Sequence, residues 1–217
     1  MVLLLFSFGA CKRDAAFHKP VFKLKEGNFW NYQGKFNGQA VELRMDVKQV
    51  KKEGMLTLAV IRGFPTDVME GVDWEAMEWG LLVAGNEHYY KVAAKRADSI
   101  IRCLSDHGCT GEGIVTDADL FMEALCDTGQ TFGEAVHLTR NDGNYCWRVV
   151  EKSAFEPTSI RGLKLMGPLD RFALTYKTVS DEVTMDVVPE IGIVRYRYSH
   201  HGSPAELDMK LTEAKLE

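Results

Sequence analysis

The sequence 183-VTMDVVPEIGIVRYRYSHHGSPAELDMKL-211 alternates apolar and polar residues in three short segments. Pro189, Gly192 and the turn formers at residues 201–204 separate these segments. Successive side chains of a strand point to opposite faces, so the pattern predicts a β-meander with one buried face and one solvated face. A one-residue slip would expose the whole apolar set, which fixes the register. The side chains predicted to face inward are Val183, Met185, Val187, Tyr196, Tyr198, Leu207, Met209 and Leu211.

Similar runs recur through the rest of the chain. They predict strands at residues 41–47, 55–61, 81–83, 88–94, 98–103, 135–140, 145–150 and 172–179. Residues 117–125 form the one predicted helix, because Thr116 and Asp119 suit a helix N-terminus. The predicted fold class is all-β and mainly antiparallel, a curved sheet forming an open barrel or sandwich with at most one or two short helices. We expect the apolar face of the meander to pack against strands 41–47 and 55–61.

Length and composition favour one globular domain. The chain has 217 residues, of which 46% are hydrophobic, enough to fill a sizeable core. The net charge is -5, and the longest basic cluster is Lys51-Lys52, so a nucleic-acid partner is not expected. We divide the chain into a signal-peptide remnant at residues 1–10, a tether at 11–19 and a single β domain at 20–217.

The first residues, 1-MVLLLFSFGAC-11, form an apolar run that ends in small residues and a cysteine. The run is too short to cross a bilayer. It resembles the end of a bacterial lipoprotein signal peptide, whose lipobox places small residues before a cysteine that becomes lipidated. The resemblance implies a lipid on Cys11 and a membrane partner through that anchor. The alternative is a buried N-terminal strand. Lys12 follows Cys11 where aspartate would favour the inner membrane, so the expected location is the cell envelope, at the outer membrane facing the periplasm or the cell surface.

Four further cysteines are consistent with an exported chain, in which an even number of thiols favours disulfides. Three pairings are open. Proximity in sequence suggests Cys103 with Cys109 and Cys126 with Cys146. A metal site is the alternative, because His107 lies between the first two cysteines, but the spacing is not the usual C-x-x-C. We predict two disulfides, and neither a metal nor a cofactor.

Both ends of the predicted domain carry turn motifs with aromatic anchors. Leu24 precedes G-N-x-W-x-Y at residues 27–32, and Pro189 precedes G-I-V at residues 192–194. This order is similar to a group of bacterial secreted and lipoprotein β domains of unknown function, and Glu190 stands where those domains often have glycine. The resemblance implies an antiparallel β fold outside the cytoplasm and no established activity.

Catalytic patterns are sparse. The chain holds no G-x-S-x-G, P-loop or H-E-x-x-H motif. His200 and His201 follow Ser199, but adjacent strand residues face opposite sides, so we interpret the histidines as solvent-exposed turn residues. The chain is therefore not predicted to be an enzyme.

Two stretches contain apolar residues without a strand period, namely residues 66–80 and 156–168. We expect them to border any opening in the sheet. The candidate rim residues are Trp74, Trp79, Leu163, Leu165 and Met166. An acidic run surrounds the two tryptophans and could bind a sugar or a cation, although a solvated loop is the preferred interpretation; its members are Asp67, Glu70, Asp73, Glu75 and Glu78.

The sequence thus favours a lipid-anchored envelope protein that acts as a binding or interaction module, with an envelope protein or an apolar small molecule as its partner. A structural subunit of a larger envelope complex is the second hypothesis, and an enzyme is the third.

Overall fold

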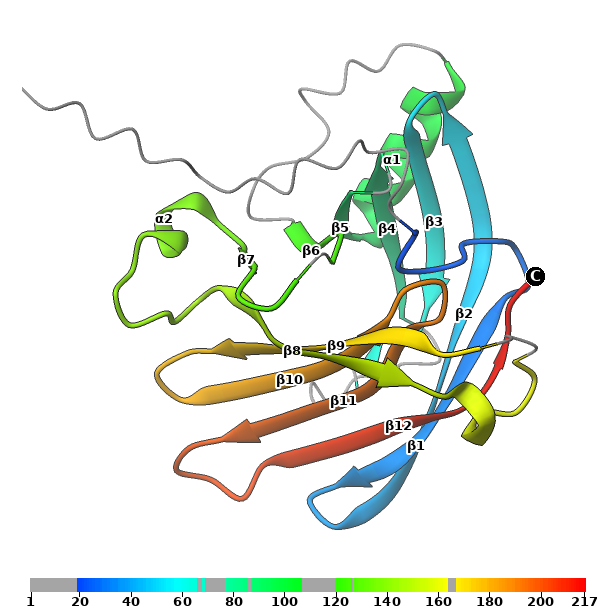
Figure 1. Ribbon diagram of the computed structural model, residues 1–217. Helices are drawn as coiled ribbons and strands as arrows, with labels where there is room; N and C mark the ends of the chain where they lie inside the picture. Colours follow the sequence, from blue (N-terminus) through cyan, green and yellow to red (C-terminus); the bar gives the residue numbers. More distant parts are fainter. Residues whose placement is uncertain are drawn as a thin grey trace, which may run out of the picture.

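A computed structural model describes residues 19–65, 68, 77–85, 87–106, 120–125, 127–163 and 167–217. Their strands form one antiparallel sheet of twelve strands that curls into a nearly closed barrel (Figure 1). The strand order is β6-β5-β4-β3-β2-β1-β12-β11-β10-β9-β8-β7, so β6 and β7 are the two edges of the sheet. The all-β, mainly antiparallel fold class is confirmed.

The strands of the first half are β1 (Phe29–Phe36), β2 (Gln39–Glu53), β3 (Leu56–Arg62), β4 (Glu78–Ala84), β5 (His88–Ala93) and β6 (Leu120–Glu123). Those of the second half are β7 (Thr131–Phe132), β8 (Trp147–Phe155), β9 (Leu169–Lys177), β10 (Asp181–Val188), β11 (Gly192–His200) and β12 (Glu206–Lys215). The halves join where β1 pairs with β12, so the first and last strands of the chain meet in the middle of the sheet.

The meander predicted from alternation is formed by β10, β11 and β12. Six of its predicted inward side chains are buried, and Val183 and Tyr198 are half-buried. These side chains belong to one core cluster with Leu43, Met45 and Val47 of β2 and with Ala59 and Ile61 of β3. The predicted packing of the meander against strands 41–47 and 55–61 is therefore confirmed. Met55 is the exception, because it lies in the turn before β3 and is 80% exposed.

The two turn motifs of the sequence resemblance lie against each other. Trp30 and Tyr32 point into the barrel, where the Trp30 indole donates to the Ile191 carbonyl and the Tyr32 hydroxyl donates to the Ile193 carbonyl at 2.9 Å. Glu190, in the β10–β11 turn, has a φ of 71°, in the left-handed region that favours glycine. The motifs thus tie β1 to the β10–β11 turn.

Close contact between β1 and β12 depends on a missing side chain. Gly34 pairs with Met209 across the two strands. A Cβ atom on Gly34 would lie 1.9 Å from the Asp208 carbonyl oxygen, far inside a van der Waals contact. Only glycine fits at this position.

A helix, α1 (Ala94–Ser105), covers the outer face of the sheet where a strand at residues 98–103 was predicted. That prediction was wrong, because Ala97, Ile100 and Leu104 recur at helical spacing and form one buried stripe. The stripe packs in a second, smaller core cluster on Leu58 and Leu82 of the sheet. No helix of the described residues is long and apolar enough to cross a membrane.

Two further predicted elements were wrong. The described part of the helix predicted at residues 117–125 is the edge strand β6, whose ladder hydrogen bonds to β5 override the local capping signal. Residues 135–140 were predicted as a strand, but α2 (Ala135–Leu138) and a turn occupy them. Strand β8 therefore pairs along its length with β9 and not with residues 135–140. Residues 141–144 form a turn, as predicted.

Candidate functional site

An open depression with a volume of about 520 Å³ lies on the outer face of the sheet, beside the β9–β10, β11–β12 and β1–β2 turns. These turns gather at one end of the barrel (Figure 1). The lining residues are Lys35, Gly38, Glu182, Thr184, Arg197, Tyr198, Ser199, Glu206, Leu207 and Asp208.

Strand register arranges the polar lining in two rows across the sheet. In the first row, Thr184 pairs with Arg197, Arg197 pairs with Asp208, and Asp208 pairs with Lys35. The second row lies two residues nearer the turns, where Ser199 pairs with both Glu182 and Glu206. Residues two apart along a strand share a face, so both rows point to the outside of the barrel.

Two of the three carboxylates in the depression already have ionic partners. Arg195 donates to both oxygens of Asp208 at 2.9 and 2.7 Å, and these hydrogen bonds lower the pKa of Asp208. Lys177 lies 3.1 Å from Glu182 in the neighbouring strand. The charges of these carboxylates are therefore partly compensated before any ligand arrives.

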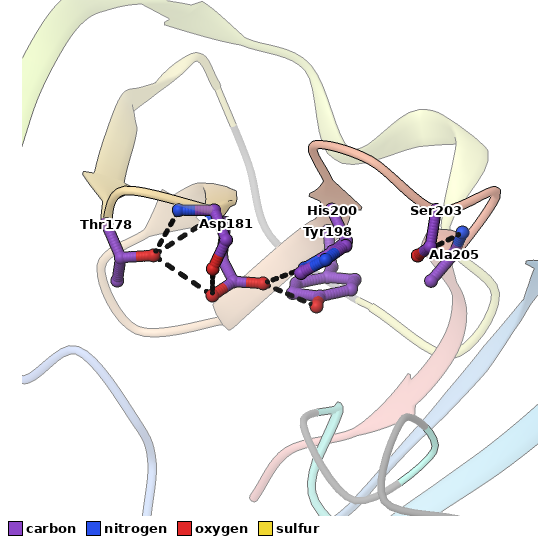
Figure 2. Close-up of polar contacts among 7 residues, drawn as sticks. Thr178, Asp181, Tyr198, His200, Ser203 and Ala205 are labelled. Atoms are coloured by element: carbon purple, nitrogen blue, oxygen red, sulfur yellow. Dashed lines mark hydrogen bonds and ion pairs between the residues drawn. The ribbon is translucent and has the colours of Figure 1, made fainter.

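A hydrogen-bonded network around Asp181 holds one rim of the depression (Figure 2). Its carboxylate accepts from the hydroxyls of Thr178 at 3.0 Å, Ser180 at 2.9 Å and Tyr198 at 2.7 Å, and contacts His200 Nδ1 at 2.8 Å. The hydrogen bonds, from His200 first, hold the pKa of Asp181 well below its usual range. The hydrogen bond that the Tyr198 hydroxyl donates to Asp181 raises the pKa of Tyr198 to about 12.

The network fastens the turn between β9 and β10 to β11. Its members lie within two adjacent hairpins, and the backbone N–H of His201 also donates to the Ser180 carbonyl at 2.6 Å. Ser199 lines the outer depression, whereas His200 contacts Asp181 on the inner side, as strand alternation predicts. A serine nucleophile with a neighbouring histidine base is therefore not assembled from these two residues.

Asn37 holds the opposite rim. Its backbone N–H donates to the Glu206 carbonyl at 2.9 Å, and its side-chain oxygen accepts from the Glu206 N–H at 2.9 Å. Asn37 and Gly38 both have positive φ values, 50° and 80°, as the tight β1–β2 hairpin requires. Both rims are thus fixed by side-chain hydrogen bonds.

Of the rim residues predicted from the sequence, the structure describes Trp79 and Leu163. Trp79 is the second residue of β4. Its half-buried side chain packs on the core, and Lys91 Nζ lies 3.8 Å from its ring centroid. Leu163 also packs half-buried on the core, after Arg161 bridges to β12. Neither lines the depression. Glu78 is the first residue of β4. The remaining candidates, Trp74, Leu165, Met166, Asp67, Glu70, Asp73 and Glu75, lie outside the described residues.

The cysteines follow the prediction only in part. Cys103 lies near the end of α1 and does not titrate as a free thiol, because it is disulfide-bonded. Cys146 is a free, buried thiol that contacts the Gly143 carbonyl at 3.5 Å, so the predicted bond between Cys126 and Cys146 is wrong for this structure. Cys11, Cys109 and Cys126 lie outside the described residues, as does His107 of the alternative metal site.

The part of the chain that the structure describes contains no group of three or more histidine, cysteine, aspartate or glutamate side chains placed to hold a metal ion. The polar groups that line the depression are ammonium, guanidinium, carboxylate and hydroxyl groups.

No protein-family model matches the chain, and no curated protein matches it in sequence. Two solved structures resemble it. A protein of Bacteroides fragilis, proposed to be exported and with a YmcC-like fold, shares 10% identity at a TM-score of 0.47, over 91% of this chain and 99% of its own. A proposed lipoprotein of Parabacteroides distasonis shares 11% identity at a TM-score of 0.41, over 91% of this chain and 99% of its own.

Proposed function

We propose that this chain is a lipid-anchored cell-envelope protein that acts as a binding module through the depression on β10–β12 and β1. The observation that carries the proposal is the depression itself, an open concave surface with charged and hydroxyl groups whose two rims are fixed by Asp181 and Asn37. Preorganised polar groups in a concave surface suit recognition because little ordering remains to be done on binding.

The fold separates the depression from the start of the domain. Lys19 Nζ lies 2.8 Å from Glu190, and the Pro20 carbonyl accepts from the Glu190 N–H at 2.7 Å, so the domain begins beside the β10–β11 turn. The depression lies toward the opposite ends of these strands. Strand β10 has eight residues and spans about 26 Å. The start of the described domain therefore lies at the far end of these strands from the binding surface.

The lining favours a polar partner over the apolar small molecule considered from sequence. Most lining residues are charged or carry a hydroxyl group. The inward side chains of the sheet, in contrast, pack on one another in the main core cluster. We accordingly propose an envelope protein or a polar molecule as the ligand, with no catalysis, and an outer-membrane location.

The binding role is tested by placing a photo-crosslinking amino acid at Ser199 in the native cell. We expect an adduct at this position because its side chain lines the depression. The control position is Met55, which is 80% exposed and lies in the β2–β3 turn. Adducts at both positions or at neither would contradict a specific binding surface at the depression.

The anchor is tested separately by Cys11→Ser. We expect the variant to move from the membrane fraction to the soluble fraction, because several acyl chains hold a protein firmly at a bilayer and the variant would lack them. A variant that fractionates with membranes as the parent chain does would contradict lipidation at Cys11.

A further inference from the structure

We infer that the depression binds a zwitterionic group, with an oxyanion held by Arg197 and Lys35 and an ammonium held by Glu206. This inference rests on the proposed binding role of the depression and names the ligand class. The inference depends on which charged side chains of the depression already have an ionic partner and which do not.

The cation side consists of Arg197 and Lys35, which flank Asp208 on either side in register. Asp208 is committed to Arg195 by two hydrogen bonds. Among the described residues, neither the Arg197 guanidinium nor the Lys35 ammonium forms a hydrogen bond or a salt bridge, and both side chains are exposed. The Arg197 charge contributes, after Arg195, to the lowered pKa of Asp208, but its N–H donors are not used. Two cations with free donors in one depression favour an anion, and a guanidinium can donate two parallel hydrogen bonds to a carboxylate or phosphate.

The acid side consists of Glu206, which lies in the second row beside Ser199. Glu182 of the same row is paired with Lys177. The Glu206 carboxylate is exposed and contacts no hydrogen-bond or ionic partner among the residues that the structure describes, since only its backbone is held by Asn37. A purely anionic ligand would meet an uncompensated carboxylate here, whereas a ligand with an adjacent ammonium would pair with it.

The spacing of the two rows sets the separation of the ligand charges. Arg197 and Ser199 are two residues apart on β11, as are Asp208 and Glu206 on β12. Two residues of a strand span about 7 Å. The ligand class is therefore an oxyanion and an ammonium separated by a short chain, which describes an ω-amino acid and equally a phospholipid headgroup with an amine.

A ligand series with increasing charge separation measures this distance. The full chain, in a non-ionic detergent, is titrated with glycine, 4-aminobutyrate and 6-aminohexanoate, and with acetate and butylamine as single-charge probes, while amide chemical shifts are followed by NMR. We expect shifts at residues 197, 199 and 206, with the tightest binding for the longer amino acids and a dissociation constant on the order of 1 mM. Vesicles with and without phosphatidylethanolamine then separate a lipid headgroup from a free molecule as the source.

Two substitutions and one control identify the charged groups that bind the ligand. Arg197→Gln and Glu206→Gln should each weaken binding of the best amino acid about tenfold, the effect of one charge-assisted hydrogen bond. Lys52→Gln is the matched control, because Lys52 is exposed on β2 and does not line the depression. Its affinity should not change.

Equal affinity for acetate and for 6-aminohexanoate would overturn the inference, as would an unchanged affinity in Glu206→Gln. Absence of any shift at residues 197–206 would overturn it as well. These results are separable from failure of the proposed function: a chain that crosslinks to a partner at residue 199, yet shows no preference for zwitterions, keeps the binding role and loses this ligand class.

Discussion

Met209→Asp tests the assignment of the inner face of the barrel. Met209 lies on β12 and is 0% exposed, inside the main core cluster. Removing its side chain from a packed core costs about 2 to 5 kcal/mol of unfolding free energy, and an unpaired carboxylate at the same place adds several kcal/mol more. The sum is a large share of the roughly 5 to 15 kcal/mol by which domains are stable.

The expected result is a protein that is unfolded at room temperature or melts at least about 10 °C lower, since each kcal/mol shifts the Tm of a chain of this size by roughly 2 to 4 °C. Thermal unfolding followed by circular dichroism, with urea unfolding as a second measurement, gives both quantities. Met209→Leu keeps the volume and should cost less than about 1.5 kcal/mol.

The matched control makes the same chemical change on the surface. Met55 is 80% exposed, so Met55→Asp buries no charge and should change the free energy of unfolding by less than about 0.5 kcal/mol. Equal melting temperatures for Met55→Asp and Met209→Asp would show that the inner and outer faces of β12 have been exchanged, and the outward rows of the depression would then be misplaced too.

Three further predictions concern local features. Because hydrogen bonds, that from His200 foremost, hold the pKa of Asp181 below its usual range, its stabilising effect is complete above the unfolded-state value of about 3.9 and is lost as the pH falls. Asp181→Asn should therefore flatten the acid side of a plot of stability against pH, and a parallel curve would contradict this. Gly34→Ala places a methyl group against the Asp208 carbonyl and should lower the Tm by roughly 2 to 12 °C. Cys146 should react with a thiol reagent only after denaturation, because it is buried; rapid labelling of the native protein would refute that position.

The sequence identified the meander because its side chains follow a strict period of two and one face is buried. Val187, Tyr196 and Met209 are inside, as alternation required. The helix α1 escaped detection for the opposite reason. Its Ile100 and Ile101 suggest a strand when read alone, and the helical spacing from Ala97 to Leu104 has meaning only with the outer face of β3 and β4 as its partner.

The depression could not be located from the sequence. Arg197 and Lys35 are 162 positions apart by residue number, and each is an ordinary polar residue on the solvated face of its own strand. They line one depression because β12 lies between β11 and β1 in the sheet. This strand order depends on the pairing of all the strands and cannot be read from any one segment. The signal that could have shown it is the pairing of the two turn motifs, which brings Trp30 beside Ile191 and therefore β1 into the second half of the sheet.

The pairing of β1 with β12 also governs when the barrel can form. Phe29 pairs with Lys215, so the seam that unites the two halves cannot close until nearly the whole chain is available. Contacts between residues so distant in sequence are slow to form, because the loop between them must be ordered first. Until then, β1 and β11 each present an unpaired edge, and the chain stays in two incomplete half-sheets.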